Sequence, residues 1–526
     1  MTTPHLKVRD KSEDRIRRAV VALALIGSYV ALHCFRLWTG LDIHFGLLLV
    51  IQLGFVVYTL GAAVVGHSHA DRPVPGGRVV AIVPAFEETP EALNRCIQSI
   101  LDQTGVVVTE IHVVDDGSTK HPVQPWSHPR VVWHWKPNGG KRSAQYLVLT
   151  LLAKRPETVD FILTVDSDSI LQPDAVAQML RAFDDPRVTG ASGTVFVSNT
   201  TENLVARVAD LNIGAAVTVS RMGMSLLGTL VTTSGALAMY RSHIPLKYRD
   251  DYLTSGTFGD DRKMTLYAEL EGRVVMVPDA VVHSEMPTTM KSTFRQRLRW
   301  AKSKWTNLAF TLTNMSVRHL LFPLITVGRF MVMPILAIYL VYSLSHTPNS
   351  NIVVAIGFIV ASWLNWRYAW TALYLMRRSD QSIWMRLMTW LFITPLEIIY
   401  STVFILPIQY IALFKLRDLG WGTRNNPHGL NGSSNQVASQ PIASPDLGSR
   451  QLVPAPRVSA EDVVQPVTAQ IGAYTAKAPE RSTIPTSRSS LHMQTHVQRS
   501  MPEYQHAAAV HTDEPNNPDN TGNHSI

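Results

Sequence analysis

The chain has 526 residues, of which 46% are hydrophobic and 17% charged, with a net charge of +8 and a mean hydropathy of +0.06. The charged fraction is below the roughly 25% of soluble domains, and the apolar residues gather in long runs, which excludes a single soluble globule, a collagen-like chain and a fully disordered protein. Because basic clusters flank these runs, we expect the charge to favour an anionic membrane surface and not nucleic acid.

Two apolar runs near the N-terminus, residues 19–39 and 44–66, predict a membrane hairpin. Each run is long enough to cross a bilayer core, which takes about 20 residues. A cleaved signal peptide is the alternative for the first run, but the run is too long for that and a second one follows at once. We therefore expect residues 1–76 to form an N-terminal transmembrane hairpin, with its N-terminus on the cytoplasmic side.

Residues 77–286 alternate strand-like and helix-like patterns. Strands are predicted at 79–86, 110–118 and 160–169, and helices at 90–103, 140–154 and 173–183. This alternation is typical of a doubly wound α/β sheet. Ligands bind such sheets outside the carboxyl ends of the strands. We therefore expect residues 84–88, 115–118 and 166–168 to line one crevice.

Paired carboxylates follow two of these strands. Asp166 and Asp168 are separated by one residue, a spacing that lets both bind a hard cation such as Mg²⁺ or Mn²⁺ together with substrate phosphates. An acidic turn or a helix cap is the alternative. The second acidic strand end, Asp115 and Asp116, favours the functional interpretation, because these carboxylates could accept hydrogen bonds from a nucleotide's base and ribose.

A glycine pair followed by two cations opens the next predicted helix. Backbone N–H groups, a helix N-terminus and the side chains of Lys141 and Arg142 suit a diphosphate. A turn followed by a solvated basic helix is the alternative.

Asp260 and Asp261 lie just before another helix-like run. One of these carboxylates could act as the general base for an acceptor hydroxyl. Helix capping is the alternative interpretation.

Residues 287–318 are basic and amphipathic and precede an apolar run, so they predict interfacial helices. Within them, Arg299 could neutralise a phosphate leaving group and Trp300 could offer an apolar face to a sugar ring.

Residues 319–344 and 352–376 predict two further spans. Their connector has no Lys or Arg, whereas Arg377 and Arg386 follow the second span, which places 345–351 outside and 377–387 inside.

The last apolar run, 388–414, precedes further basic residues that also indicate the inner side, yet it is too short for two crossings. Pro395 and Pro407 interrupt it, and Glu397 lies within it. We expect an interfacial or re-entrant segment; a simple fifth span is the alternative. Residues 319–416 thus form a transmembrane and re-entrant region. Residues 425–526 are rich in Ser, Pro, Asn and Gln and predict a disordered tail.

The order of these motifs resembles a known signature. Asp115-Asp116, Asp166-x-Asp168, Asp261 and Gln296-x-x-Arg299-Trp300 are similar to the D, DxD, D, QxxRW pattern of processive family 2 glycosyltransferases. Within that group, Gly259–Arg262, Ser234–Arg241 and the Trp-Gly-Thr-Arg segment at 421–424 resemble hyaluronan synthases most, although chitooligosaccharide synthases share much of this. Ala236 replaces a proline of that pattern, and Glu87 replaces an asparagine.

The resemblance implies a GT-A type, Rossmann-like catalytic fold, UDP-sugar donors and Mg²⁺ or Mn²⁺. Asp168 with Asp166 would bind the metal, Asp261 would be the base with Asp260 beside it, and Trp300, Ser234 and Gly235 would bind the acceptor. Donor contacts would come from Pro84, Glu88, Asp115, Asp116, Lys141, Arg142, Asp166, Gln296, Arg299, Trp421 and Arg424. Residues 417–424 would be a gating segment.

The expected function is that of a multi-pass plasma-membrane hexosyltransferase with a cytosolic catalytic domain. It would be processive and inverting, and would polymerise UDP-GlcNAc and UDP-glucuronate into hyaluronan while extruding the polysaccharide across the lipid membrane. A chitin-type synthase that uses UDP-GlcNAc alone is the alternative. A non-catalytic transporter or scaffold is the third hypothesis.

Overall fold

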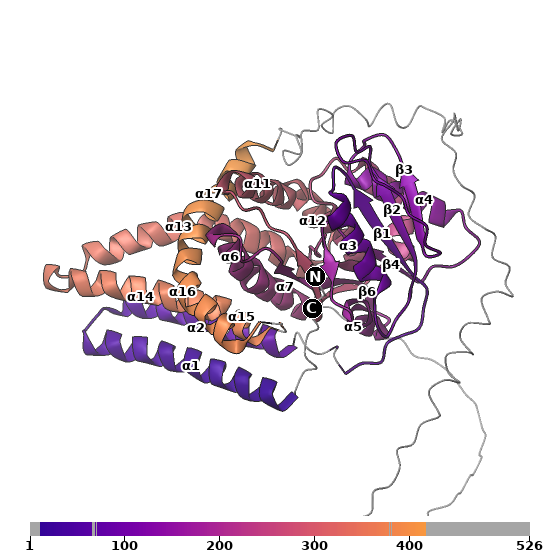
Figure 1. Cartoon of the computed structure of the whole chain (residues 1–526). Helices are drawn as coiled ribbons and strands as arrows, with labels where there is room; N and C mark the ends of the chain where they lie inside the picture. The colour runs from indigo at the N-terminus through magenta and orange to yellow at the C-terminus, as the bar shows by residue number, and fades with distance from the viewer. Residues whose placement is uncertain (1–10, 66–68, 70, 378, 380, 417–526) are drawn as a thin grey trace, which may run out of the picture. The chain divides into compact units, whose positions relative to one another are not determined.

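The computed structural model describes residues 11–65, 69, 71–377, 379 and 381–416 (Figure 1). Two long helices, α1 (Lys11–Trp38) and α2 (Ile43–Val65), precede an α/β domain, and a second group of helices follows it. Trp421, Arg424 and the predicted tail at 425–526 lie outside the described residues.

The described part of the α/β domain contains one eight-stranded mixed sheet, in the order β3-β2-β1-β4-β7-β6-β8-β5. The strands are β1 (Val79–Ala85), β2 (Val108–Asp115), β3 (Val131–Trp135), β4 (Phe161–Thr164), β5 (Ile170–Leu171), β6 (Val188–Val197), β7 (Ala238–Arg241) and β8 (Arg273–Ser284). From β3 to β4 all neighbours are parallel, and β7 pairs antiparallel with both β4 and β6. The predicted α/β fold is confirmed; the antiparallel strand within the sheet was not foreseen.

Helices cover the sheet and extend beyond it (Figure 1). In the domain they are α3 (Pro90–Leu101), α4 (Lys141–Ala153), α5 (Ala175–Arg181), α6 (Leu204–Leu211), α7 (Thr218–Leu226), α8 (His243–Lys247), α9 (Arg249–Thr254) and α10 (Asp260–Glu271). After it come α11 (Met290–Thr306), α12 (Leu308–Asn314), α13 (Leu321–Ser345), α14 (Ile352–Thr371), α15 (Leu373–Met376), α16 (Ile383–Ile399) and α17 (Leu406–Phe414).

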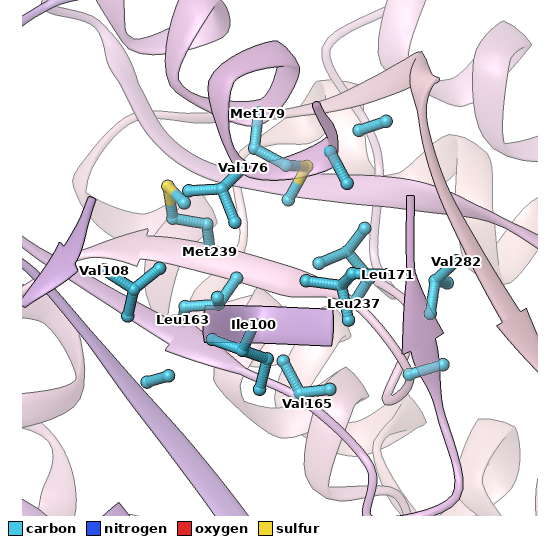
Figure 2. Packing of buried hydrophobic residues seen from close by; sticks show 14 of the residues in the cluster. Ile100, Val108, Leu163, Val165, Leu171, Val176, Met179, Leu237, Met239 and Val282 are labelled. Atoms are coloured by element: carbon cyan, nitrogen blue, oxygen red, sulfur yellow. The ribbon is translucent and has the colours of Figure 1, made fainter. Parts of the chain in front are cut away.

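The core of the domain lies between the sheet and its helices. Figure 2 shows Ile100 of α3, Leu163 of β4, and Val176 and Met179 of α5 directed toward one another. All four side chains are at most 1% exposed. Burial of each such side chain contributes about 1.5–3 kcal/mol, so this cluster holds the carboxyl ends of the parallel strands in fixed positions.

Among the described residues, three helical stretches are long and apolar enough to cross a membrane: Ala19–Trp38, Asn349–Met376 and Ile383–Phe414. Helix α13 falls in the third predicted span. Helices from before and after the α/β domain pack together. The Phe45 ring of α2 meets the Phe358 ring of α14 edge-on, with 5.8 Å between the ring centroids. The Gln52 side chain also donates a hydrogen bond to the Ser362 carbonyl oxygen at 2.7 Å.

The last apolar run forms one helical path of 32 residues, Ile383–Phe414. Helix α16 contains Pro395, widens into a π-helix at Tyr400–Ile405 and continues as α17, which has a proline in its first turn. The run is therefore helical throughout, and an interfacial or re-entrant segment and a single crossing all stay predictions.

Two charges inside these apolar helices form a buried ion pair. The Arg367 guanidinium of α14 donates two hydrogen bonds to Glu397 of α16, which also accepts one from Asn212 at 2.7 Å. Glu397 is fully buried. The sequence showed each charge but gave no sign that the two would pair.

A second buried ion pair links the helix α6 to the start of the 377–387 segment. Arg377 donates to both carboxylate oxygens of Asp210, at 3.1 and 3.2 Å, and the Tyr374 hydroxyl donates to the same group at 2.7 Å. This ion pair and the hydrogen bond between Asn212 and Glu397 fix two elements, α6 and the π-helix at Asn212–Val217, to the apolar helices that follow the domain.

Candidate active site

The carboxyl ends of β1, β2 and β4 meet at one edge of the sheet. The Asp116 N–H donates to the Ala85 carbonyl oxygen at 2.8 Å, which links the first two strand ends. The Ser167 hydroxyl donates to Glu88 Oε2 at 3.1 Å, which links the first strand end to the third. The structure therefore brings together the three acidic segments that the sequence assigned to one crevice, together with Pro84 at the end of β1.

Asp116 organises the glycine loop that precedes α4. Its Oδ1 atom accepts from the Gly139 N–H at 3.0 Å and from Lys136 Nζ at 2.6 Å, and its Oδ2 atom accepts from the Gly140 N–H at 2.7 Å. Gly140 has a φ of +86°, which favours glycine. Lys136 was missed from the sequence, because β3 was not predicted. Asp116 thus fixes the point at which Lys141 begins α4.

Lys141 forms an ion pair with Asp166 across the sheet edge. Burial lowers the pKa of Lys141, but the negative charges of Asp166 and Asp260 outweigh it and the net shift is upward, so the ammonium stays charged. A Cβ atom added to Gly235 would lie 3.2 Å from Asp166 Oδ2 and 3.3 Å from Lys141 Nζ. The lack of a side chain at Gly235 therefore leaves room for this pair. Ser234 is buried beside it and donates its N–H to Ser192 Oγ at 2.9 Å.

Asp168 carries the most perturbed carboxyl group of this edge. Burial, followed by the negative charges of Asp166 and Glu88, raises its pKa to about 7. Three carboxylates close to one another concentrate negative charge, which a divalent cation would neutralise. The described residues contain no cluster of three or more His, Cys, Asp or Glu side chains arranged as a complete metal site. Any cation here would need further oxygen ligands, from water or from the substrate.

Asp115 lies at the end of β2 and is 5% exposed. Its Oδ1 atom accepts from the Ser118 N–H at 2.9 Å, closing the turn that follows the strand. The carboxylate therefore holds the Asp115–Ser118 turn, and its predicted contact with a nucleotide stays a prediction.

Glu87 clamps the loop after that turn. Its carboxylate accepts hydrogen bonds from the N–H groups of Thr119, Lys120 and His121 and from the Thr119 hydroxyl, at 2.9–3.2 Å. Desolvation acts to raise the pKa of Glu87, but these hydrogen bonds lower it to about 2. Glu87 has a φ of +51°, unusual for a residue with a side chain. The residue that departs from the resembled pattern thus shapes the loop beside Asp115 and Asp116.

Asp260 and Asp261 open α10 but have different surroundings. Asp260 is buried and accepts from Arg142 Nε at 3.0 Å, and Arg142 also contacts Ser255 and Thr257. Arg142, predicted to bind the donor, is thus placed by the structure as the partner of Asp260. Asp261 is half-buried and accepts from the Thr232 hydroxyl at 3.3 Å.

A small cavity lies between Asp261, Asp260, Lys141 and Gly235, with room for about 20 Å³. This is enough for one water molecule and far below the several hundred Å³ of a typical ligand pocket. A sugar donor would therefore have to bind outside it, at the open edge of the sheet.

A network of buried hydroxyl groups supports the start of α10. Thr265 Oγ1 donates to the Asp261 carbonyl oxygen at 2.6 Å, and Thr233 Oγ1 bonds to the Tyr240 hydroxyl at 2.8 Å and to Thr265 at 3.1 Å. Thr233, Tyr240 and Thr265 are at most 1% exposed. Tyr240 belongs to the Ser234–Arg241 motif, but no pattern in the sequence identifies Thr233 or Thr265.

Helix α11 presents the predicted Gln296–Trp300 motif to this region. Gln296, Arg299 and Ser303 are spaced by three and four residues, so they share one face of the helix. Ser303 Oγ accepts from Arg262 Nε at 3.1 Å, next to Asp261. Trp300 packs against the edge of the sheet core. Gln296 and Arg299 are thereby placed on the side that faces α10.

The opposite side of α11 packs against α17. Lys304 donates to Gln409 Oε1 at 3.2 Å and Trp305 Nε1 donates to the Gln409 carbonyl oxygen at 3.3 Å. Ala301 packs with Ile408 and Ala412. The motif helix thus joins the sheet edge to an apolar helix of membrane type. Trp421 and Arg424, both predicted to contact the donor, lie outside the described residues.

Residues 75–303, which include the sheet and most of α11, match the family described as "Glycosyltransferase like family 2". The match therefore covers the α/β domain and leaves the helices before residue 75 and after residue 303 outside it.

Proteins of two kinds are similar to this chain. An "N-acetylglucosaminyltransferase" of Mesorhizobium japonicum is 33% identical over 282 residues, covering 50% of this chain and 65% of that protein, and one of Rhizobium meliloti is 34% identical over 257 residues, covering 46% and 59%. A "Hyaluronan synthase" of Streptococcus pyogenes is 31% identical over 271 residues, covering 48% and 63%. The chain therefore spans less than two thirds of the length of these relatives.

One solved structure, "Mannosyltransferase PcManGT from Pyrobaculum calidifontis in complex with GDP-Man and Mn2+", aligns with a TM-score of 0.40 and 16% sequence identity. The alignment covers 67% of this chain and 99% of that chain.

Proposed function

We propose that this chain is a membrane-embedded, processive, inverting glycosyltransferase that polymerises UDP-GlcNAc and UDP-glucuronate into hyaluronan at the plasma membrane. The observation that carries the proposal is that one sheet edge holds Lys141 paired with Asp166, and that the small cavity beside this pair is also lined by Asp261. A cation for a leaving group and a carboxylate for an acceptor proton are thus held close together.

In the proposed reaction, Asp261 accepts the proton of the acceptor hydroxyl as that oxygen attacks the anomeric carbon of the donor. The bond between this carbon and the UDP oxygen breaks on the opposite side, so the configuration is inverted. Lys141 and Arg299 stabilise the negative charge on the departing UDP. The ion pair between Asp260 and Arg142 keeps the second carboxylate of the pair occupied, which leaves Asp261 as the base.

Asp166 and Asp168 would hold Mg²⁺ or Mn²⁺, because burial and the nearby carboxylates of Asp166 and Glu88 together raise the pKa of Asp168, and a cation would stabilise its charged form. Such a cation supplies charge neutralisation for the diphosphate. The turn of Asp115 and the loop held by Asp116 would position the nucleotide, with Pro84, Glu88 and Gln296 around it.

Extrusion of the product is supported by the contact between α11 and α17. Trp300 would stack against the acceptor sugar, and Ala301 of the same helix packs on Ile408 and Ala412. A chain that leaves the acceptor site would therefore meet the helices of membrane type directly. Membrane lipid would surround Ala19–Trp38, Asn349–Met376 and Ile383–Phe414.

The second candidate is a synthase that makes chitin-type oligomers from UDP-GlcNAc alone. It is favoured by the 33–34% identity to the two N-acetylglucosaminyltransferases. The two candidate functions differ in whether synthesis requires UDP-glucuronate.

The test is to incubate the purified chain with Mg²⁺ or Mn²⁺ and UDP-GlcNAc, with and without UDP-glucuronate, and to digest the product with hyaluronidase. We expect a long polymer only with both donors, and its complete digestion. A product that forms from UDP-GlcNAc alone and resists hyaluronidase would establish the second candidate instead. Absence of UDP release with any donor would refute both.

A further inference from the structure

Arg297 of α11 is a buried cation that no role described above explains. It is 5% exposed, and its Nε and Nη2 atoms have no hydrogen-bond partner in the part of the chain that the structure describes. Buried charges in proteins are nearly always paired, because an unpaired one loses its hydration without compensation. The environment of Arg297 therefore calls for an anionic partner that comes from a ligand.

The guanidinium of Arg297 lies over the Trp300 ring, 4.4 Å from its centroid. Trp300 is the residue that the proposed function assigns to the acceptor sugar. A cation stacked on an aromatic ring fixes the plane of that ring and keeps its own N–H groups free at the edge. An anion bound by Arg297 would thus lie beside a sugar that rests on Trp300.

The position of Arg297 on α11 separates it from the donor side. Residues two apart on a helix do not face each other, so Arg297 and Arg299 point to different sides. Residues three and four apart do share a face, and these are Trp300 and Ala301. Ala301 packs on Ile408 of α17. Arg297 therefore borders both the acceptor platform and the membrane-type helix, along the path proposed for the product.

We propose that Arg297 binds a carboxylate of a uronic acid in the nascent polysaccharide and so selects acidic acceptor chains. This inference rests on the proposed function, because it takes Trp300 as the acceptor platform. A guanidinium binds carboxylate and phosphate groups with paired hydrogen bonds. The carboxylate is the partner that fits, since the diphosphate is assigned to the side of Arg299 and Lys141.

The test compares Arg297→Gln, Arg297→Lys and the wild-type chain, each full-length and purified in detergent. The assay measures transfer of GlcNAc from UDP-GlcNAc onto two soluble acceptors. The acidic acceptor is a tetrasaccharide of alternating glucuronate and GlcNAc with glucuronate at its growing end. The neutral acceptor is a tetramer of GlcNAc. Inhibition by UDP reports the donor site. Arg295→Gln, on an exposed residue of the same helix, removes the same charge as a matched control.

We expect Arg297→Gln to raise the KM for the acidic acceptor at least tenfold, and at least five times more than the KM for the neutral one, with unchanged inhibition by UDP. Arg297→Lys, which keeps the charge, should recover part of the loss. Arg295→Gln should behave as wild type.

Equal losses with both acceptors would overturn the inference and leave Arg297 as a residue that only positions Trp300. A change confined to UDP inhibition would assign it to the diphosphate. A wild-type chain that uses the neutral acceptor alone would refute the inference while glycosyl transfer stands. A wild-type chain that uses neither acceptor and releases no UDP would refute the proposed function as well.

Discussion

The sheet edge and the apolar helices both contain buried carboxylates, but the two regions differ in how far these negative charges are compensated. At the sheet edge, burial and then the negative charges of Asp166 and Glu88 raise the pKa of Asp168 to about 7. In the apolar helices, Glu397 is fully buried and its charge is met by Arg367 and Asn212. The first region keeps an uncompensated charge where a substrate and a cation would bind, and the second compensates its charge within the protein. We therefore expect the first cluster to take part in the reaction and the second to stabilise the packing of the helices.

The largest effect is expected from Asp261→Asn at the sheet edge. The amide cannot accept the acceptor proton, so sugar incorporation should fall about 1,000-fold, within the range that a general base contributes. Donor binding should be unchanged, because the side chain of Asp261 bonds to Thr232 and not to the glycine loop that precedes α4. Incorporation of labelled sugar and the inhibition constant of UDP measure the two properties.

Asp250→Asn, on an exposed carboxylate of α9, is the control for Asp261→Asn and should keep wild-type activity. Incorporation by Asp261→Asn within tenfold of the wild type would contradict the assignment of the base.

The next effect concerns the buried pair in the helices. Glu397→Gln would leave the Arg367 cation without its counter-charge and should lower the free energy of unfolding by about 3 kcal/mol. Thermal unfolding in lipid nanodiscs measures the loss. The double variant Arg367→Leu, Glu397→Leu removes both charges, so it should be more stable than the single variant. If Glu397→Gln unfolds at the wild-type temperature, the pair does not stabilise the helices.

A smaller effect is expected from Lys136→Met, which removes one of the three hydrogen bonds to Asp116. The glycine loop keeps its backbone hydrogen bonds, so the chain should fold. A hydrogen bond to a charged group contributes about 1.5–3 kcal/mol, and we expect the KM for the donor to rise about tenfold. Lys154→Met, on an exposed lysine, is the matched control and should leave this KM unchanged.

The smallest effect is expected from Glu87→Gln. The amide oxygen replaces only part of the acceptor capacity of the carboxylate, so the loop at Thr119–His121 should loosen and the KM for the donor should rise about threefold. Because the folded-state pKa is about 2, below the ordinary 4.5, the contribution of Glu87 to stability is full above pH 4.5 and is lost as the pH falls through 2.

The ratio of KM for Glu87→Gln to KM for the wild type should therefore be constant between about pH 6 and 8. A ratio that changes in this range would show that Glu87 titrates there. Glu91→Gln, on an exposed residue of α3, is the control and should match the wild type.

The sequence predicted the parallel half of the sheet well, because each buried strand is a continuous apolar run that ends in polar residues. Asp115, Asp166 and their neighbours follow such runs, so their meeting at one edge could be foreseen. Strand β7 could not be foreseen, because Ala238–Arg241 is only four residues long and carries no strand pattern of its own. Lys136 was missed for a related reason: it acts from the end of β3, a strand with a partly exposed and mixed sequence.

Contacts between distant segments were also beyond prediction. The hydroxyl groups of Thr233 and Thr265 belong to common residues without a characteristic spacing, and only the fold places them under Asp261. Arg367 and Glu397 are 30 residues apart on different helices. The continuous helical path of the last apolar run was not foreseen either, because Pro395 and Pro407 were expected to interrupt it, whereas the π-helix at Tyr400–Ile405 lets it continue.

The packing of α2 on α14 has a consequence for how the chain is made. Phe45 and Gln52 contact Phe358 and Ser362, so the first two helices leave the ribosome long before the helix on which they pack. The whole α/β domain, with strands from Val79 to Ser284, is synthesised in between. The domain can therefore fold while the helix bundle is still half-built, and α2 lacks its contacts with α14 until that helix has been made. Mutations on the face of α2 that packs on α14 should reduce the yield of inserted protein before they affect the activity of the molecules that mature.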